Sequence, residues 1–534
     1  MKPKNIFLLL TIAGAIAFSL SEINFYPQLS QGDHGRDMYA AQAVLRGGLP
    51  YKDFWWVYGP LMPYYYAFFY KFLGGTIGSF LLGKMVLKTV CALFFYLAGT
   101  TAMAPSVAFL AAMWLTQSQQ DFFFTFNHIG GITAQMAILF LLFSYINTPS
   151  RSANANRYLW LTLPFIIAFC LIKINFGLTS MTAVILTALI TDSVRKTPFT
   201  VNKKKFYLST LAAMAFVTLV YWSLLKDLPL YALRQCMPYF GDDQPHHFSP
   251  LITIPYYFTQ HWLTFIHSPI NMVLGLILHG ATIMSAVLLF TGRIQTEQKQ
   301  KLLLQLGLLG TYFALNFHEF IVSGVWYRTF WSLPFLFMFH FLMMSTAFNI
   351  LPALARRLIW AAFGALLALG LLAAFMSAQQ QKVPPRFLNS PHGKIYVGNE
   401  LEWTSTVNTV TEYLNKNLNS DELFFALPYD CIYYYLTGKP SPTRQLIFFN
   451  HIKIPPQQEE AIINDLETKK VNYVLMSNRI QSSETGLGVF GKTYCPLISR
   501  YITANFEPVA RQGGDWEKEP GWGNNHGVLI FRRK

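Results

Sequence analysis

Stretches of apolar residues long enough to cross a lipid bilayer recur from Ile6 to about Ala378 and then stop. Because a transmembrane helix needs about 20 consecutive, mostly apolar residues, this pattern excludes a single soluble core. The composition agrees, since 53% of the 534 residues are hydrophobic and only 13% are charged, against about 25% in soluble domains. The sequence therefore predicts an α-helical polytopic membrane domain over 1–378 and a soluble domain over 379–534.

Eleven apolar segments are predicted to be transmembrane helices. They cover residues 5–22, 78–99, 101–118, 132–148, 158–174, 175–191, 206–225, 270–291, 303–323, 331–349 and 359–378. The first segment follows Lys2 and Lys4, and charge before a short apolar core is also the pattern of a cleaved signal peptide. We predict an uncleaved first helix, because further apolar segments follow it.

The basic residues predict the orientation, because cytoplasmic loops of membrane proteins are rich in Lys and Arg. With a cytoplasmic N-terminus, the following residues all fall in the cytoplasm: Lys2, Lys4, Arg151, Arg157, Arg195, Lys196, Lys203, Lys204, Lys205, Arg293, Lys299, Lys301, Arg356 and Arg357. This placement accounts for the net charge of +15 without a nucleic-acid partner, which we do not expect.

An odd number of spans then places the C-terminal domain outside the cytoplasm, together with the long loops 23–77, 119–131 and 226–269. These loops are rich in Trp and Tyr, which favour the headgroup layer. Membrane lipids are therefore expected contacts of the outer loops.

The first outer loop has the densest polar chemistry of the chain. The run Gly32-Asp33-His34-Gly35-Arg36-Asp37 places two carboxylates, an imidazole and a guanidinium within five residues. A short helix is predicted over 37–46, because Gly47, Gly48 and Pro50 follow it and such residues end helices. So many charged groups at a membrane surface indicate a functional site.

This loop resembles the first loop of the GT-C superfamily, polytopic glycosyltransferases that use lipid-phosphate-linked sugars. The resemblance is strongest to a bacterial branch with protein O-mannosyltransferases, lipid A aminoarabinose transferase and lipopolysaccharide-core galacturonosyltransferase-like proteins. Their pattern is an Asp, often Asp-Glu, a Tyr-containing helix, Leu-x-Gly-Gly, Pro-Tyr-x-Asp and Gly-Pro. Aligning on Gly47-Gly48 and Pro50-Tyr51 puts Asp33 on the catalytic Asp, with His34 where Glu is common.

The resemblance implies a GT-C-like fold in the bacterial inner membrane, with an α/β C-terminal domain in the periplasm or outside the cell. It also implies transfer of a sugar from polyprenyl phosphate to an acceptor hydroxyl, normally with inversion. Asp33, or Asp37 as second choice, would be the base. Arg36, Lys173 and Arg328 would stabilise the leaving phosphate.

Several properties of such a reaction stay open at this stage. The sugar is not readable, and the acceptor hydroxyl could belong to a glycan, lipid A or a protein. A divalent cation, Mg²⁺ or Mn²⁺, could take part, because carboxylates near a phosphate are typical ligands. No metal ligands are assigned.

The candidate residues also have structural alternatives. Asp33 or Asp37 could cap a helix, and Asp53 is expected to order the Pro-Tyr turn. Lys173 could reach lipid headgroups, and Arg328 could anchor the interface.

Two polar pairs elsewhere are supporting candidates. Asn127-His128 precedes Gly130-Gly131 near the second outer loop, and His318-Glu319 lies near the outer end of a span. An ionisable pair in an apolar segment is a functional candidate by default.

The C-terminal region predicts a small α/β domain, because helices and strands alternate along it. The expected elements are a helix over 403–417, a strand over 422–427, helices over 429–437 and 457–470, and strands over 471–477 and 527–532. The run Tyr433-Tyr434-Tyr435-Leu436-Thr437-Gly438-Lys439 resembles a segment of the relatives' domains that would cover the site, contact the acceptor or serve as a structural cap. A disulfide between Cys431 and Cys495 stays open.

Two other functions remain as alternatives. An O-antigen ligase or polymerase would need several arginines in a long outer loop, and loop 226–269 has only Arg234. A transporter or flippase for lipid-linked sugars would place polar residues at broken helices near the midplane, often within repeated halves. We detect no repeat, and the candidate site residues lie at the outer surface.

Overall fold

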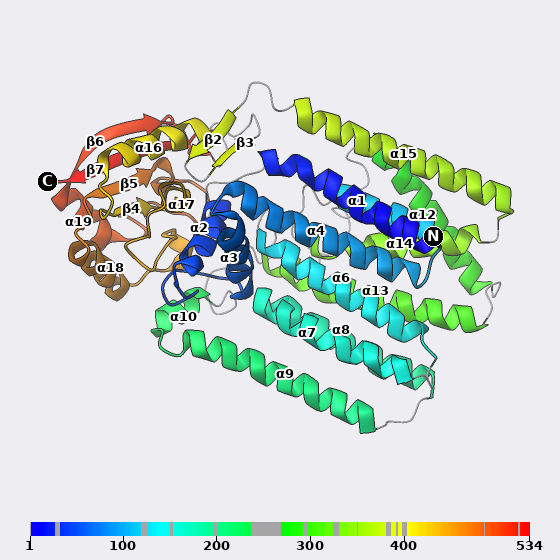
Figure 1. Cartoon of the computed structure of the whole chain (residues 1–534). Coiled ribbons are helices and arrows are strands. Elements are labelled where there is room, and N and C mark those ends of the chain that lie inside the picture. The colour runs from blue at the N-terminus through cyan, green and yellow to red at the C-terminus, as the bar shows by residue number, and fades with distance from the viewer. Residues whose placement is uncertain are drawn as a thin grey trace.

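The computed structural model describes residues 2–26, 32–118, 126–149, 153–196, 201–236, 269–291, 296–323, 330–349, 351–380, 386–390, 393–397, 403–484, 486–521 and 524–534. Long helices run side by side in a bundle, and a domain containing a small sheet lies at one end of it (Figure 1). We call this end of the bundle the domain end and the opposite end, where the N-terminus lies, the distal end.

Each predicted span corresponds to one long helix among the described residues. These are α1 (Pro3–Asn24), α4 (Ile77–Thr100), α5 (Pro105–Ser118), α6 (Phe126–Asn147), α7 (Ala153–Ile172), α8 (Ile174–Val194), α9 (Val201–Leu225), α12 (Pro269–Phe290), α13 (Thr296–Ser323), α14 (Leu333–Phe348) and α15 (Ala353–Gln380). Segments in α1, α4, α6, α8 and α9 are long and apolar enough to cross a membrane, and α5, α7, α12 and α14 hold shorter apolar segments. The protein is therefore a multi-pass membrane protein, as predicted.

The connections between spans differ slightly from the prediction, for local reasons. The turn expected at Thr100 extends to residue 104, because Pro105 begins α5 and proline favours the first position of a helix. The break between α7 and α8 falls at Lys173, whose backbone is extended (φ −154°, ψ 99°). The short pair of helices around Lys173 is thus confirmed.

The first outer loop folds into two helices that lie between the bundle and the C-terminal domain (Figure 1). They are α2 (Asp33–Leu45) and α3 (Leu61–Leu73). The predicted helix over 37–46 thus begins four residues earlier, at Asp33. Of the predicted loop 226–269, the structure describes α10 (Leu230–Cys236), whereas residues 237–268 lie outside the described part.

The C-terminal domain is built on a mixed four-stranded sheet. Its strands are β4 (Phe424–Leu427), β5 (Tyr473–Ser477), β7 (Gly527–Arg533) and β6 (Phe506–Gly513), in the order β4-β5-β7-β6. β4 and β5 are parallel, and the other pairs are antiparallel. All residues of β4 and β5 are buried, as expected for strands covered on both faces.

Helices and short turns surround this sheet. They are α16 (Trp403–Asn417), α17 (Ile432–Thr437), α18 (Pro456–Thr468), α19 (Pro496–Asn505) and the 3₁₀ turns Asn450–Ile452 and Asn478–Ile480. The predicted elements of this domain are confirmed to within a few residues, but α19 and β6 were not predicted.

A second, smaller sheet joins the chain segment that follows the first span to the segment that follows the last span. The strand β1 (Phe25–Tyr26) directly follows α1 and pairs in parallel with β3 (Gly393–Val397), which also pairs with β2 (Arg386–Ser390). The chain segments next to the first and last spans therefore meet at the domain end.

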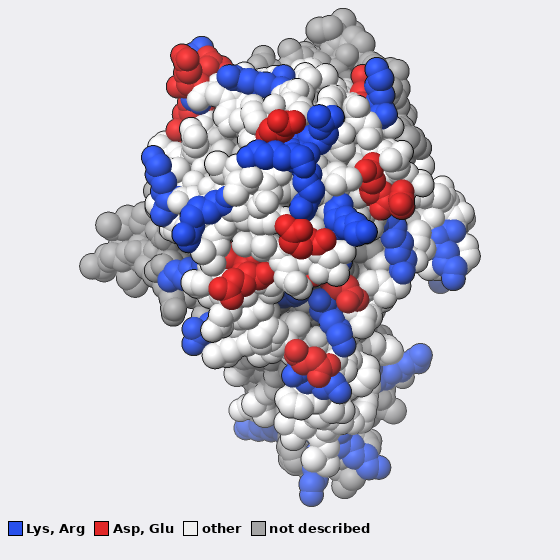
Figure 2. All heavy atoms as spheres, turned by 90° about the vertical axis from the view of Figure 1, so that its left-hand side faces the viewer, with Lys and Arg blue, Asp and Glu red and all other residues white. Residues whose placement is uncertain are grey.

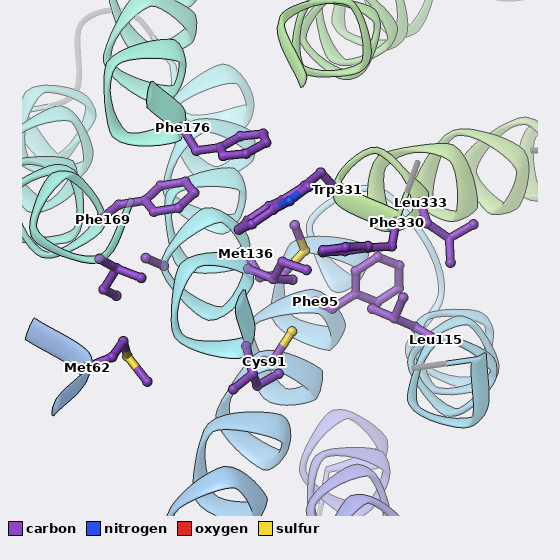
Figure 3. Packing of buried hydrophobic residues seen from close by; sticks show 14 of the residues in the cluster. Met62, Cys91, Phe95, Leu115, Met136, Phe169, Phe176, Phe330, Trp331 and Leu333 are labelled. Atoms are coloured by element: carbon purple, nitrogen blue, oxygen red, sulfur yellow. The ribbon is translucent and has the colours of Figure 1, made fainter. Parts of the chain in front are cut away.

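One hydrophobic core runs from the bundle into the C-terminal domain. Inside the bundle, Cys91 and Phe95 of α4, Met136 of α6 and the ring of Trp331 pack together (Figure 3). Trp331 stacks on Phe176 with ring centroids 3.9 Å apart.

The same core includes residues of the first loop and of the C-terminal domain, among them Tyr39, Trp56, Tyr429 and Ile432. The first loop is thus packed on both sides. Its residues are positioned by the bundle and by the C-terminal domain together.

The outward face of the C-terminal domain has basic and acidic side chains interspersed (Figure 2). Individual ion pairs contribute to this pattern, such as Arg533 with Glu467 at 3.1 Å and Lys518 with Asp515 at 3.2 Å. A mixed surface of this kind is typical of a solvated protein face.

Candidate active site

The first turn of α2 places its charged side chains on one face. Asp33 is the first helical residue and Gly32 is the N-cap, with no side-chain cap, so neither Asp33 nor Asp37 occupies the N-cap position. Residues three and four apart are neighbours on a helix surface. Arg36 and Asp37 therefore lie on the same side as Asp33.

The guanidinium of Arg36 holds both carboxylates. Its Nε and Nη2 donate to Oδ1 of Asp37 at 3.0 and 2.8 Å, and its Nη1 donates to Oδ1 of Asp33 at 3.2 Å. Burial alone would lower the pKa of Arg36, but the negative charges around it, Asp37 first, hold this pKa well above its ordinary value. Arg36 is therefore a permanent cation between two anions.

The carboxylates of Asp33 and Asp37 differ in their exposure to solvent. The side chain of Asp33 is 28% exposed and that of Asp37 only 2%. Asp37 also accepts a hydrogen bond from Nδ2 of Asn127 at 3.1 Å, so the predicted pair Asn127-His128 reaches the site through its asparagine. Asp37 is thus enclosed, whereas Asp33 can meet a substrate.

The C-terminal domain supplies a residue that the sequence did not reveal. The hydroxyl of Tyr429, just after β4, donates to Oδ1 of Asp33 at 2.7 Å and accepts from Nη1 of Arg36 at 2.9 Å. Gly35 allows this approach, because a Cβ at that position would lie 2.6 Å from the backbone nitrogen of Ile432. The site is thus formed by two regions that lie far apart in the sequence.

A second charged cluster forms at the break between α7 and α8. Nζ of Lys173 lies 2.6 Å from Oε1 of Glu319, and Nδ2 of Asn175 donates to the other oxygen of Glu319 at 3.1 Å. Asn175 also lies 2.9 Å from Nε2 of His318. The structure therefore brings together Lys173 and the pair His318-Glu319, which the sequence suggested separately.

The ring of Tyr58 lies between the two clusters. The guanidinium carbon of Arg36 is 5.1 Å from its centroid and Nζ of Lys173 is 5.9 Å from it, both within the range of cation–π attraction. The ring of His128 also packs edge-on against Tyr58, with centroids 5.8 Å apart. Arg36, Lys173 and His128 thus surround one aromatic side chain.

Gly59 fixes the position of Tyr58 next to Lys173. The N–H of Gly59 donates to the carbonyl of Ile172 at 2.8 Å, and a Cβ at Gly59 would lie 2.2 Å from the carbonyl oxygen of Leu171. The Gly-Pro motif therefore allows the first loop to pack closely against the C-terminal end of α7.

Replacing Gly59 by alanine is expected to lower the apparent unfolding temperature of the purified protein in detergent. The added methyl group would overlap a backbone carbonyl that cannot rotate away, and such overpacking costs about 1–3 kcal/mol or more. A matched control is Gly280→Ala on α12, where a Cβ would meet nothing within 4 Å. A thermal scan that finds the two variants equally stable would rule out this close approach.

The other predicted residues fall as follows. Oδ2 of Asp53 accepts from the N–H of Leu49 at 2.7 Å, the turn contact expected from the sequence. His34 is fully buried. Arg328 lies outside the described residues.

Two lysines on α4 are further candidate site residues that were not predicted from the sequence. Lys84 and Lys88 are 2% and 0% exposed and lie one turn apart, hence on one helix face. Side chains on a helix lean toward its N-terminus, and the N-terminus of α4 is at the domain end. Charges inside an apolar segment were the available indication of a functional role.

The C-terminal domain contains a further buried polar cluster behind Tyr429. Oδ2 of Asp430 accepts from Ser477 at 2.7 Å, and burial raises the pKa of Asp430 to about 6. Burial also lowers the pKa of Arg479 to about 10, so Arg479 stays cationic at neutral pH. All five cysteines, including Cys431 and Cys495, are free and buried, so the disulfide left open by the sequence is not formed.

The fold is similar to those of solved membrane-protein structures. ArnT from Cupriavidus metallidurans bound to undecaprenyl phosphate matches with a TM-score of 0.57 at 12% identity, over 98% of this chain and 97% of that chain. The apo state of that protein matches with a TM-score of 0.56 at 11% identity, over 98% of both chains. The apo oligosaccharyltransferase of Archaeoglobus fulgidus matches with a TM-score of 0.50 at 11% identity, over 90% of this chain and 70% of that chain.

No protein-family model matches the sequence, and no curated protein matches it either. At 11–12% identity the structural similarity shows the fold alone. Because the match to ArnT covers nearly all of both chains, it includes the helix bundle and the C-terminal domain. The chain therefore has the predicted fold, a bundle of apolar helices like that of ArnT, followed by a C-terminal domain with a small sheet.

Proposed function

We propose that the protein is a glycosyltransferase of the bacterial inner membrane that moves a sugar from a polyprenyl-phosphate donor to an acceptor hydroxyl. The observation that carries this proposal is the partly exposed carboxylate of Asp33, held by Arg36 and Tyr429 beside an aromatic ring that also contacts Lys173. A base next to cations suits a reaction that removes a hydroxyl proton and releases a phosphate.

The proposed reaction proceeds in one displacement. Asp33 takes the proton of the acceptor hydroxyl as the hydroxyl oxygen bonds to the anomeric carbon. The bond from that carbon to the phosphate oxygen breaks, and the phosphate leaves with the electron pair. Attack opposite the leaving group inverts the anomeric carbon.

The cations have separate roles in this scheme. Arg36 holds Asp33 and Asp37 and adds positive charge to the site. Lys173 binds the donor phosphate and exchanges part of its pairing with Glu319 for the incoming anion. Arg328 is proposed as a second phosphate ligand on the basis of its place in the sequence.

A divalent cation does not fit between the two carboxylates. The guanidinium of Arg36 already bridges Asp33 and Asp37 at 2.8–3.2 Å, and a metal ion there would be repelled by it. In the described part of the chain, no group of three or more His, Cys, Asp or Glu residues is placed to hold a metal. The proposed reaction therefore has no Mg²⁺ or Mn²⁺ between Asp33 and Asp37.

The distribution of basic residues supports a site on the periplasmic side of the membrane. Basic residues such as Lys4, Arg195 and Arg357 lie at helix ends away from the C-terminal domain, whereas the candidate site lies at the domain end (Figure 1). By the distribution of Lys and Arg, the distal end is cytoplasmic and the domain end is periplasmic. Acceptors on that side include glycans, lipid A and protein hydroxyls, which we leave as alternatives.

The test uses the full-length protein in liposomes with undecaprenyl-phosphate-linked sugars extracted from the producing cells. We expect release of undecaprenyl phosphate and a matching mass increase in an envelope acceptor, both measured by mass spectrometry. Movement of the intact donor across the bilayer without sugar transfer would contradict the proposed enzymatic function and favour a transporter. Comparing envelope glycans with and without the gene then identifies the acceptor.

A further inference from the structure

The C-terminal domain docks on the first loop through a continuous set of contacts. They involve Ser441 N–H to the Tyr39 hydroxyl at 2.9 Å, Trp55 N–H to the Arg444 carbonyl at 2.7 Å, and Arg46 Nη2 to the Gly438 carbonyl at 2.6 Å. α17 packs against α2 at the same place (Figure 1). The first loop and the segment after β4 therefore form one interface.

Tyr429 also belongs to this interface, and its hydroxyl forms a hydrogen-bond network with Asp33 and Arg36. It donates to Oδ1 of Asp33 at 2.7 Å and accepts from Nη1 of Arg36 at 2.9 Å, while Nη1 itself lies 3.2 Å from Oδ1 of Asp33. Tyr429 is only 4% exposed. Two donors thus meet on one oxygen of the carboxylate and fix its orientation.

The sheet topology explains why Tyr429 reaches the membrane site. β4 and β5 are parallel, so their carboxyl ends lie at one edge of the sheet, where α/β proteins commonly place functional residues. Tyr429 follows β4 and Arg479 follows β5. Both residues therefore come from the edge that faces the first loop.

We infer that Tyr429 positions Asp33 for proton abstraction, so that the C-terminal domain is part of the active site. This inference rests on the proposed function, because it assigns Asp33 as the base. Tyr429 touches the base and not the reacting atoms, so it is a positioning residue. Without its hydroxyl, the carboxylate keeps Arg36 as a partner but loses the donor that restrains its rotation.

Tyr429 remains a donor at all working pH values. Burial raises the pKa of Tyr429 well above its ordinary value, so the phenol stays protonated. Among the described residues, the titratable and charged groups that interact with Asp33 or Tyr429 include Arg36, Cys431 and Arg479. Asp37 and Tyr58 interact with Arg36, and Asp430 and Glu484 interact with Arg479. A variant that removes only the Tyr429 hydroxyl leaves all of these charges in place.

The test compares Tyr429→Phe with Tyr501→Phe in the full-length protein. Each variant deletes a tyrosine hydroxyl of the C-terminal domain that donates to a carboxylate and accepts from an arginine, but the Tyr501 hydroxyl contacts Glu467 and Arg533 at 2.7 and 2.8 Å, away from the first loop. The assay uses undecaprenyl-phosphate-linked sugars extracted from the producing cells. It measures kcat and KM for the donor over a range of pH, together with the apparent unfolding temperature.

Tyr429→Phe is expected to lower kcat about tenfold to a hundredfold, as expected when a general base is misplaced, while the donor KM changes by less than about threefold. Loss of a hydrogen bond to the ionised carboxylate disfavours that form. The acidic limb of the pH profile should therefore move to higher pH. Tyr501→Phe should keep the wild-type kcat and pH profile although it loses a hydroxyl network of the same kind.

A Tyr429→Phe enzyme with wild-type kcat and an unmoved pH profile would overturn the inference, as would equal losses of kcat in both variants. Asp33→Asn separates this failure from that of the proposed function. If Asp33→Asn is inactive and Tyr429→Phe is fully active, only the role of Tyr429 is wrong. If the wild-type protein transfers no sugar, the proposed function itself fails. An Asp33→Asn protein as active as the wild type would instead contradict the assignment of Asp33 as the base.

Discussion

Replacing Asp33 by asparagine is expected to reduce sugar transfer by at least about a hundredfold, the typical contribution of a general base. Asparagine keeps the size of the side chain and an acceptor oxygen, so Arg36 and Tyr429 retain a hydrogen-bond partner. The Asp33 side chain is also 28% exposed, which limits the effect on stability. The variant should therefore fold like the wild type and fail in catalysis.

Replacing Asp37 by asparagine is expected to act on folding instead. Asp37 and Arg36 have side chains that are 2% and 3% exposed, and breaking a buried ion pair from one side costs about 3–5 kcal/mol. The apparent unfolding temperature in detergent should fall clearly. Any loss of transfer should follow the loss of folded protein.

The two variants together decide which carboxylate is the base. Transfer is measured per folded molecule, after size-exclusion chromatography, and Asp227→Asn serves as the control. Asp227 pairs with Lys52 at 3.6 Å on the surface, with a side chain that is 59% exposed. An Asp37→Asn protein that folds normally but transfers no sugar, beside an active Asp33→Asn protein, would move the catalytic role to Asp37.

The membrane domain was largely readable from the sequence because its determinants are local. Apolar segments of spanning length identified the helices, and Lys and Arg at their ends predicted which ends lie together. The run from Asp33 to Asp37 stood out for the same reason, since its charges are adjacent in sequence and fall on one helix face. Local patterns of this kind need no knowledge of tertiary contacts.

The partners of those residues were not readable, because they come from distant positions. Tyr429 is 396 residues away from Asp33, and Glu319 is 146 residues away from Lys173. No periodicity links such pairs, and only the folded chain brings them together. For this reason Lys173 was readable as a cation but its pairing with Glu319 was not.

The second helix of the first loop could not be predicted from the sequence for a different reason. α3 has the sequence Leu-Met-Pro-Tyr-Tyr-Tyr-Ala-Phe-Phe-Tyr-Lys-Phe-Leu, and aromatic residues have only modest helix propensity. Its fold comes from tertiary contacts, such as the stacking of Tyr66 on Phe80 with centroids 3.8 Å apart. No helix was predicted for this segment, which was assigned to the outer loop 23–77.

Replacing Lys173 by methionine is expected to abolish donor binding and to lower stability together. The side chains of Lys173 and Glu319 are 11% and 12% exposed, so methionine would leave the carboxylate of Glu319 without its cation in a largely buried place. Removing one partner of such a pair costs about 3–5 kcal/mol. Binding of undecaprenyl phosphate to the purified protein and its apparent unfolding temperature should both fall.

The double variant Lys173→Met with Glu319→Leu separates the two effects. Replacing both members of a buried pair by apolar residues is often neutral for stability, so the double variant should recover most of the unfolding temperature lost by Lys173→Met. It should not recover undecaprenyl phosphate binding, because the double variant still lacks the Lys173 cation next to Tyr58. Recovery of both properties would instead mean that Lys173 serves only to neutralise Glu319, and that the donor phosphate must be bound by other cations, with Lys84 and Lys88 of α4 the next to test.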